Sequence, residues 1–310
     1  MSWLSQLWPF GDRPDQQNHA GSQPAPSGRS LEPDEHPGPE EIPAETAPPA
    51  RSTLVWLLGC AKLVDTPITP VERHALDAVA RMLAQPEIPE NLLPRAAAQV
   101  AQLIGLVRQT DLPTPAVAER IGNDAVLAAE VMRLASSPYY RVQGRVRDLE
   151  QAISLIGLQG VQTVIARALL KPIYQSPPGP LSARAAPRMW DHSEALARHT
   201  AILCEPAGQP VFDGYLAGML NDTGWVVAFS IIDRAGKHLP VPPSQAFGDA
   251  LTEQSHRLFG LAAQRWDITP GFTALARDAR SNGLTAAQHP LALLLRRAQQ
   301  LTLGELDPRS

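Results

Sequence analysis

The sequence predicts an all-α protein, a bundle of helices that follows a disordered, acidic, proline-rich N-terminal segment. From Arg51 onward, apolar residues recur at helical spacing, as at Leu149, Ala152, Ile153 and Ile156. No run of residues alternates apolar and polar side chains as a half-buried strand would. The first 50 residues instead hold ten of the chain's 31 prolines, and eight acidic residues against two arginines. Their composition is that of a solvated linker.

Residues 1–50 divide into two parts. Residues 11–50 contain one Leu, one Ile and no Val, Phe, Tyr or Trp, so little apolar surface offsets the entropy cost of ordering them. We predict that they are disordered. The first ten residues, MSWLSQLWPF, carry large apolar side chains at Trp3, Leu4, Leu7, Trp8 and Phe10. Two interpretations stay open: an unstructured start with incidental aromatics, or a short docking peptide that binds a partner groove or a membrane surface.

Helical periodicity and capping residues predict the elements of the body in order. An N-terminal helical extension, 51–91, contains helices at 52–64 and 70–84. The main domain is 92–285, and its helices are predicted at 94–109, 114–121, 124–135, 149–157, 161–168, 183–205, 211–232, 244–266 and 270–279. Asp148 caps the helix at 149, Gly157 to Gly160 ends it, and Asn123 or Asp124 caps the helix before 135.

The C-terminal segment, 286–310, belongs to a last helix predicted at 285–302 and capped by Thr285. Its leucines are Leu291, Leu293, Leu294, Leu295 and Leu301. We expect this helix to pack back on the body or to form the seam of a dimer.

Charge and composition exclude several classes of protein. The net charge is −4, but the first 50 residues carry −6, which leaves +2 for the body and disfavours a nucleic-acid binder. Cys60 and Cys204 are too few for a disulfide framework and suit a reducing compartment. The longest uncharged run, 151–166, has 16 residues, whereas a membrane span needs about 20 apolar ones. We expect a cytoplasmic protein with no membrane span.

A reactive site in an all-helical protein is built from side chains on facing helices. The candidates are His192, Asn221, Asp222, Glu253, His256 and Asp278. The stretch LPTPAVAERIGNDAVLAAEVMRLASSPYYRVQGRVRDLEQAISLIGLQGVQTVIARALL resembles the first half of an HDOD domain. MWDHSEALARHTAILCEPAGQPVFDGYLAGMLNDTGWVVAFSIID and EQSHRLFGLAAQRWDITPGFTALARDARS resemble the second half. The resemblance extends from about Leu92 to about Ser281.

The resemblance implies an all-helical fold related to the HD phosphohydrolases, whose metal site uses a His, an adjacent His-Asp pair and a later Asp. HDOD domains are regarded as having lost that activity, and they serve bacterial signalling as interaction or regulatory modules. His192 fits the first ligand, and Asp222, 30 positions later, fits the Asp of the pair. Asn221 stands where the family usually has His, and LARDARS stands where relatives often have two His.

This departure weakens the predicted metal site. An Asn oxygen is a poor ligand for transition metals, and His192 and Asp222 alone give two protein ligands where a catalytic metal typically has three. Glu253 and His256, spaced i and i+3, lie on one helical face and would have to complete the set. The structural alternative is that His192 and Asp222 form a buried pair that fixes the packing of two helices. We therefore predict no metal, no cofactor and no catalytic residue.

Candidate partner contacts lie elsewhere. Arg141, Arg145 and Arg147 form a basic cluster, either an ordinary solvated loop or a clamp for a carboxylate or phosphate. Trp190, which resembles the Trp of the family's Trp-x-His-Ser start, is either core or a partner contact. The sequence thus predicts a non-catalytic signalling module that binds other signalling proteins or senses a ligand. The resemblance implies response regulators or cyclic-dinucleotide enzymes as partners. The alternative is a metal-dependent phosphohydrolase with an altered HD site.

Overall fold

The structure, a computed structural model, describes residues 52–89, 91–92, 113–136, 146–174, 179–236 and 238–306. In these ranges the regular elements are all helical, and Val64 and Ser244 form an isolated β-bridge. The predicted fold class is therefore confirmed. Residues 1–50, with their aromatic start, and the helix predicted at 94–109 lie outside the described residues.

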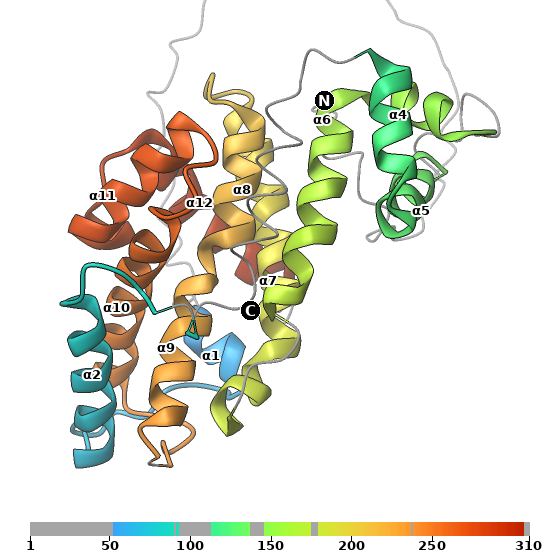
Figure 1. The fold of residues 1–310 in the computed structure, drawn as a ribbon. Helices are drawn as coiled ribbons and strands as arrows, with labels where there is room; N and C mark the ends of the chain where they lie inside the picture. Colours follow the sequence, from blue (N-terminus) through green and yellow to red (C-terminus); the bar gives the residue numbers. More distant parts are fainter. Residues whose placement is uncertain are drawn as a thin grey trace, which may run out of the picture.

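The helices follow one another closely along the chain (Figure 1). Their bounds are α1 (Thr53–Leu58), α2 (Pro70–Leu83), α4 (Thr114–Gly122), α5 (Ala125–Ala135), α6 (Leu149–Leu170), a 3-10 turn (Lys171–Tyr174), α7 (Pro180–Cys204), α8 (Val211–Asn221), α9 (Thr223–Arg234), α10 (Gln245–Ala263), α11 (Pro270–Ala286) and α12 (Pro290–Leu306). The caps at Asp148 and Asp124 are present, since each carboxylate accepts backbone N–H groups of the helix that follows.

Helices α7 to α12 form a bundle, and α4 and α5 form a lobe that stands to one side of it (Figure 1). In the bundle α7 packs along α8 and α12, and α10 packs between α9 and α11. Helix α6 joins the two parts, because it contacts α4 and α5 as well as α8. Gly157 interrupts α6 with φ 69° and ψ 173°, a left-handed conformation that glycine adopts without strain. The predicted stop at Gly157 is thus a kink within one long element.

The N-terminal extension packs directly on the bundle through α2. Glu72 forms a capping box with Thr69, whose N–H donates to Glu72 Oε2 at 2.7 Å. The same carboxylate accepts from the N–H of Ser244 at 2.7 Å and from its hydroxyl at 3.1 Å, just before α10 begins. Glu72 is 1% exposed. One buried carboxylate therefore joins the start of α2 to the start of α10.

Several predicted elements differ from the structure: the helix predicted at 52–64 ends at Leu58, and the one predicted at 270–279 continues to Ala286. The helix predicted at 211–232 is two helices, α8 and α9, which meet at Asp222. The last helix begins at Pro290 and not at 285, so Thr285 lies inside α11 and caps nothing. Its first turn is preceded by N–H groups of Gln288 and His289, both of which donate to Asp278 at 2.7 Å. α12 packs on α7, α8 and α11, which is one of the two arrangements expected for it.

Two helical stretches of the described chain, 149–174 and 211–234, are long and apolar enough to cross a membrane by length and composition alone. The core helices of a soluble protein pass the same test. All of the apolar window in 211–234 is buried inside the bundle, as is half of that in 149–174. The sequence argument considered only the longest run without a charged residue, whereas both stretches contain charged side chains, such as Arg167 in the first and Asp222 in the second.

Candidate functional site: a sealed polar cluster at the α8–α9 break

The predicted HD positions come together where α7 passes the break between α8 and α9. His192 and Ser193 lie in the middle of α7, and Asn221 and Asp222 lie at the break. The helices approach closely because α8 has Gly218 at the crossing, where a Cβ atom would lie 2.4 Å from Ala197 Cα. His192, Ser193 and Asp222 are 0% exposed and Asn221 is 2% exposed. These four side chains are therefore out of contact with bulk water.

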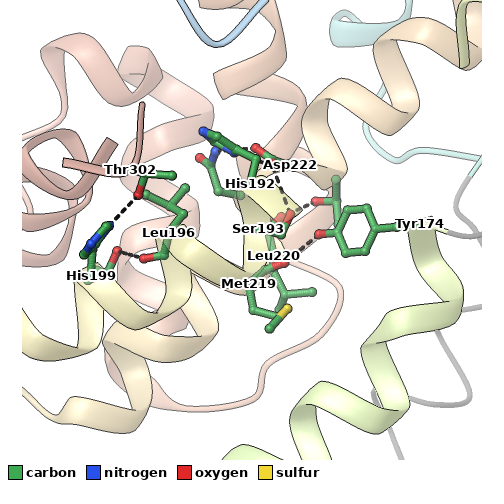
Figure 2. A network of polar contacts seen from close by, with 12 residues as sticks. Tyr174, His192, Ser193, Leu196, His199, Met219, Leu220, Asp222 and Thr302 are labelled. Atoms are coloured by element: carbon green, nitrogen blue, oxygen red, sulfur yellow. Dashed lines mark hydrogen bonds and ion pairs between the residues drawn. The ribbon is translucent and has the colours of Figure 1, made fainter. Parts of the chain in front are cut away.

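The Asp222 carboxylate is hydrogen-bonded on both oxygens (Figure 2). His192 Nδ1 lies 2.6 Å from Oδ2, and the Ser193 hydroxyl donates to the same oxygen at 2.9 Å. The Asn221 side-chain N–H donates to Oδ1 at 3.0 Å. Since an ionised carboxylate only accepts, Nδ1 is the ring nitrogen that carries a proton. A buried charge held by three donors in this way is stabilised, and the three donors are stabilised with it.

Hydroxyl groups satisfy the backbone at the break. The Tyr174 hydroxyl donates to the carbonyl of Met219 at 2.5 Å, and the Thr223 hydroxyl donates to that of Leu220 at 2.6 Å. These carbonyls lie in the last turn of α8, where no intrahelical partner exists. Burial raises the pKa of Tyr174, and the negative charge of Asp222 raises it further. Tyr174 therefore stays neutral and acts as a donor.

Sequence reasoning missed Ser193 and Tyr174. Adjacent residues on a helix point in different directions, so the sequence gives no reason to expect that His192 and Ser193 share a partner. Asp222, however, lies at the break between α8 and α9, and both the His192 imidazole and the Ser193 hydroxyl are hydrogen-bonded to its carboxylate. Tyr174 comes from a 3-10 turn 48 positions before Asp222, and no local pattern indicates that contact.

Glu253 and His256 lie one turn apart on α10 and have different surroundings. His256 is 7% exposed; burial lowers its pKa to about 4, and the charges of Glu253 and Asp222 oppose this only in part. Glu253 instead forms an ion pair with Arg257 at 3.0 Å and lies against Gly283, where a Cβ atom would meet its carboxylate at 2.1 Å. The imidazole of His256 is thus buried within reach of the charges of Glu253 and Asp222, and the carboxylate of Glu253 forms its ion pair with Arg257.

The residues present do not fit the metal that the resemblance implies. No group of three or more His, Cys, Asp or Glu side chains within the described ranges is placed to hold a metal ion. Both oxygens of Asp222 are used by protein donors, and one of those donors is the Asn221 amide that replaces a His ligand. His192 Nε2 and Asn221 Oδ1 are buried and have no hydrogen-bond partner among the described residues. Two weak or single donors do not make a catalytic metal site.

The predicted partner contacts are only partly described. Arg141 and Arg145 lie outside the described residues, and Arg147 is exposed, with its backbone N–H donating to Gln151. Trp190 is half-buried: its ring lies 6.0 Å from that of Tyr174 and 5.5 Å from Lys171 Nζ. The exposed part of the Trp190 ring therefore lies beside the Lys171 ammonium group, and the ring packs near Tyr174, which is hydrogen-bonded to the end of α8.

Comparison with known proteins places this geometry in context. The sequence profile of the HDOD domain matches residues 93–279. A curated relative, an uncharacterized protein of Treponema pallidum (strain Nichols), is 19% identical over 186 residues, which cover 57% of this chain and 35% of the relative. The chain thus spans about a third of that protein's length.

One solved structure shares the fold, and a second is reported for comparison. The crystal structure of the protein named Putative metal-dependent phosphohydrolase from Shewanella amazonensis SB2B is 19% identical, with a TM-score of 0.55, over 77% of this chain and 85% of that one. That of an HDOD domain protein with unknown function from Geobacter sulfurreducens is 21% identical, with a TM-score of 0.41, over 76% and 93%.

Proposed function

This chain belongs to the HDOD domain family, and from that premise we propose that it is a non-catalytic module of bacterial signal transduction that acts by binding other proteins in the cytoplasm. The observation that supports this proposal is the closed state of the HD position. Asp222 is 0% exposed, and each of its oxygens accepts from a side chain of this chain. A metal or a phosphate ester would have to displace those donors and part α7 from α8.

The sealed cluster then has a structural role. It ties α7 to the α8–α9 break at a point where two helix ends would otherwise leave polar groups unpaired. Such a tie fixes the relative position of three helices and keeps the outer surface of the bundle in one shape. A rigid helical surface suits a module that binds partners.

The lobe offers the surface for a partner. Glu130 on α5 forms an ion pair with Arg167 on α6, and Arg167 also pairs with Glu194 on α7, so one arginine connects the lobe to the bundle. The basic residues Arg141, Arg145 and Arg147 follow α5 in the sequence. An acidic surface on a response regulator or on a cyclic-dinucleotide enzyme is the partner chemistry that matches them.

Two measurements test the proposal. Purified protein is analysed for bound metal and assayed with Mn²⁺, Fe²⁺ or Mg²⁺ on p-nitrophenyl phosphate and on cyclic dinucleotides. We expect less than stoichiometric metal and no turnover above that of an Asp222→Ala variant. Stoichiometric metal with turnover that Asp222→Ala abolishes would instead establish the alternative, a phosphohydrolase with an altered HD site. The buried and unpartnered atoms His192 Nε2, Asn221 Oδ1 and His256 Nδ1 are the observation that favours that alternative.

The binding half of the proposal needs its own test. Wild-type protein and a variant with Arg141, Arg145 and Arg147 changed to Ala are used to capture partners from the native host. We expect a specific partner with the wild type and at least a tenfold loss of its affinity with the triple variant. Equal capture by both would show that the basic cluster is an ordinary solvated loop.

A further inference from the structure

A cavity of about 120 Å³ lies between the start of α7 and the end of α9, and the segment 238–241 closes a further side of it. None of its lining residues belongs to the sealed cluster. Pro180 and His238 line the cavity and are exposed, so it opens to solvent. The cavity is therefore a separate candidate for ligand binding.

Half of the lining is apolar. It consists of Leu181 on α7, Ile232 on α9, and Leu239 and Val241 in the segment that follows α9. Leu181 and Ile232 are buried, and the other two are half-buried. An apolar cavity of about 150 Å³ holds a benzene ring, so the space here suits an aliphatic group of about four carbon atoms.

The Asp233 carboxylate lines the cavity in a fixed position. The N–H of Leu181 donates to Oδ1 at 2.9 Å, and the N–H of Ser182 donates to Oδ2 at 2.9 Å. Gly179 permits this approach, because a Cβ atom there would lie 2.4 Å from Oδ2. A carboxylate has about four acceptor positions, so both oxygens can still accept from a ligand.

The Arg184 guanidinium lines the same cavity and is also held in place. Its Nε donates to the carbonyl of Leu58, at the end of α1, at 2.6 Å. Within the described ranges its terminal nitrogens have no hydrogen-bond partner, and no ion pair joins Arg184 to Asp233. The cavity therefore presents a positive and a negative group that are fixed by the fold and not paired with each other, and a site fixed in this way loses little freedom on binding.

We propose that this cavity binds a small zwitterion with an aliphatic side chain, an α-amino acid such as valine. The ligand carboxylate accepts from the terminal nitrogens of Arg184, and the ligand ammonium donates to Asp233. The side chain lies against the apolar part of the lining.

The two charges also give the cavity its selectivity. A ligand with only a carboxylate brings a negative charge toward Asp233 with nothing to offset it, and one with only an ammonium meets Arg184 in the same way. Binding of such a ligand needs no partner protein. The proposal therefore holds or fails independently of the proposed signalling function.

Isothermal titration calorimetry on the full chain tests the proposal with three probes. L-valine carries both charges, isovalerate is the same skeleton without the ammonium, and isobutylamine is the same skeleton without the carboxylate. We expect saturable binding of one L-valine per chain, with a dissociation constant on the order of 1 mM or lower, and at least about tenfold weaker binding of the other two.

Variants then assign the binding to this cavity. Arg184→Gln is expected to weaken L-valine binding by at least about tenfold. Arg188→Gln is the matched control, because Arg188 lies one turn further along α7 and does not line the cavity. Circular dichroism shows first that both fold; if Arg184→Gln does not, Asp233→Asn removes the opposite charge and keeps an acceptor for the start of α7.

Three results would overturn the proposal. The first is the absence of saturable L-valine binding up to about 10 mM. The second is isovalerate or isobutylamine binding as tightly as L-valine, since the cavity would then recognise one charge only. The third is equal binding of L-valine by Arg184→Gln and Arg188→Gln, which would place the ligand elsewhere.

Discussion

Removal of the Asp222 carboxylate tests whether the sealed cluster holds the bundle together. Asp222→Ala leaves His192 Nδ1, the Ser193 hydroxyl and the Asn221 amide without their acceptor in a site that is 0% exposed at Asp222. Each stranded donor costs roughly 1–3 kcal/mol, and breaking a buried pair typically costs about 3–5 kcal/mol. We expect a loss of about 4 kcal/mol, which lowers Tm by on the order of 10 °C for a chain of this size.

Urea and thermal unfolding followed by circular dichroism measure this loss. The matched control is Asp249→Ala, since Asp249 is exposed and accepts one hydrogen bond, from Gln245 at 2.8 Å. A double-mutant cycle with His192→Leu separates the pair from its surroundings. We expect a coupling of about 2 kcal/mol, because His192 has lost its partner once Asp222 is gone. If Asp222→Ala costs no more than Asp249→Ala, the structural role assigned to the cluster is wrong.

Three further predictions concern the rest of the bundle. Burial lowers the pKa of His256 from 6.5 to about 4 in the folded protein, so the unfolded state binds the proton more tightly. The free energy of unfolding is therefore full above pH 6.5 and falls by about 3 kcal/mol toward pH 4. His256→Phe should reduce this dependence on pH, as measured by urea unfolding at a series of pH values. Burial raises the pKa of Glu72, but hydrogen bonds from Ser244 and Thr69 lower it more, so its contribution is present above pH 4.5 and lost below; Glu72→Gln should cost about 2 kcal/mol at pH 7 and nothing extra in acid. Gly224→Ala places a Cβ 2.0 Å from a backbone carbonyl of α10 and should cost more than about 2 kcal/mol in urea unfolding, whereas Gly304→Ala, which meets nothing, should stabilise α12 by up to about 1 kcal/mol; equal effects of the two would contradict the close approach of α9 and α10.

Local sequence patterns predicted the helix ends well where a residue next to the helix end caps it. Asp148 and Asp124 act within two or three positions of the helix start that they cap, and both have the expected effect, whereas Gly157 kinks α6 and does not end it. The errors arise where a distant group decides. The residues just before α12 are held by Asp278, which accepts the N–H groups of Gln288 and His289 ten and eleven positions later, so a cap at Thr285 could not be excluded from the sequence.

The candidate site shows the same limit. Apolar residues continue after Asn221, Asp222 and Thr223, which is why the pattern predicts one helix over 211–232, although these three polar residues mark the point where α8 ends and α9 begins. The break depends on hydroxyl donors from Tyr174 and Thr223, the first of them 48 positions away. The resemblance identified His192 and Asp222, and only the packing of three helices shows that Ser193 and Asn221 bind the same carboxylate.

The hydrogen bonds of Glu72 show that the stretch matched by the family profile is shorter than the part of the chain that packs together. The stretch by which relatives are recognised begins at residue 93, but the N–H group that opens α10 is bonded to a side chain 172 residues earlier, at the start of α2. A chain cut to residues 93–279 would strand that amide, bare the side of α9 and α10 that α2 covers, and remove α12 from α7. The inherited unit is thus smaller than the unit that folds. In this chain the segments on either side of residues 93–279 therefore cover surfaces that the matched stretch alone would expose.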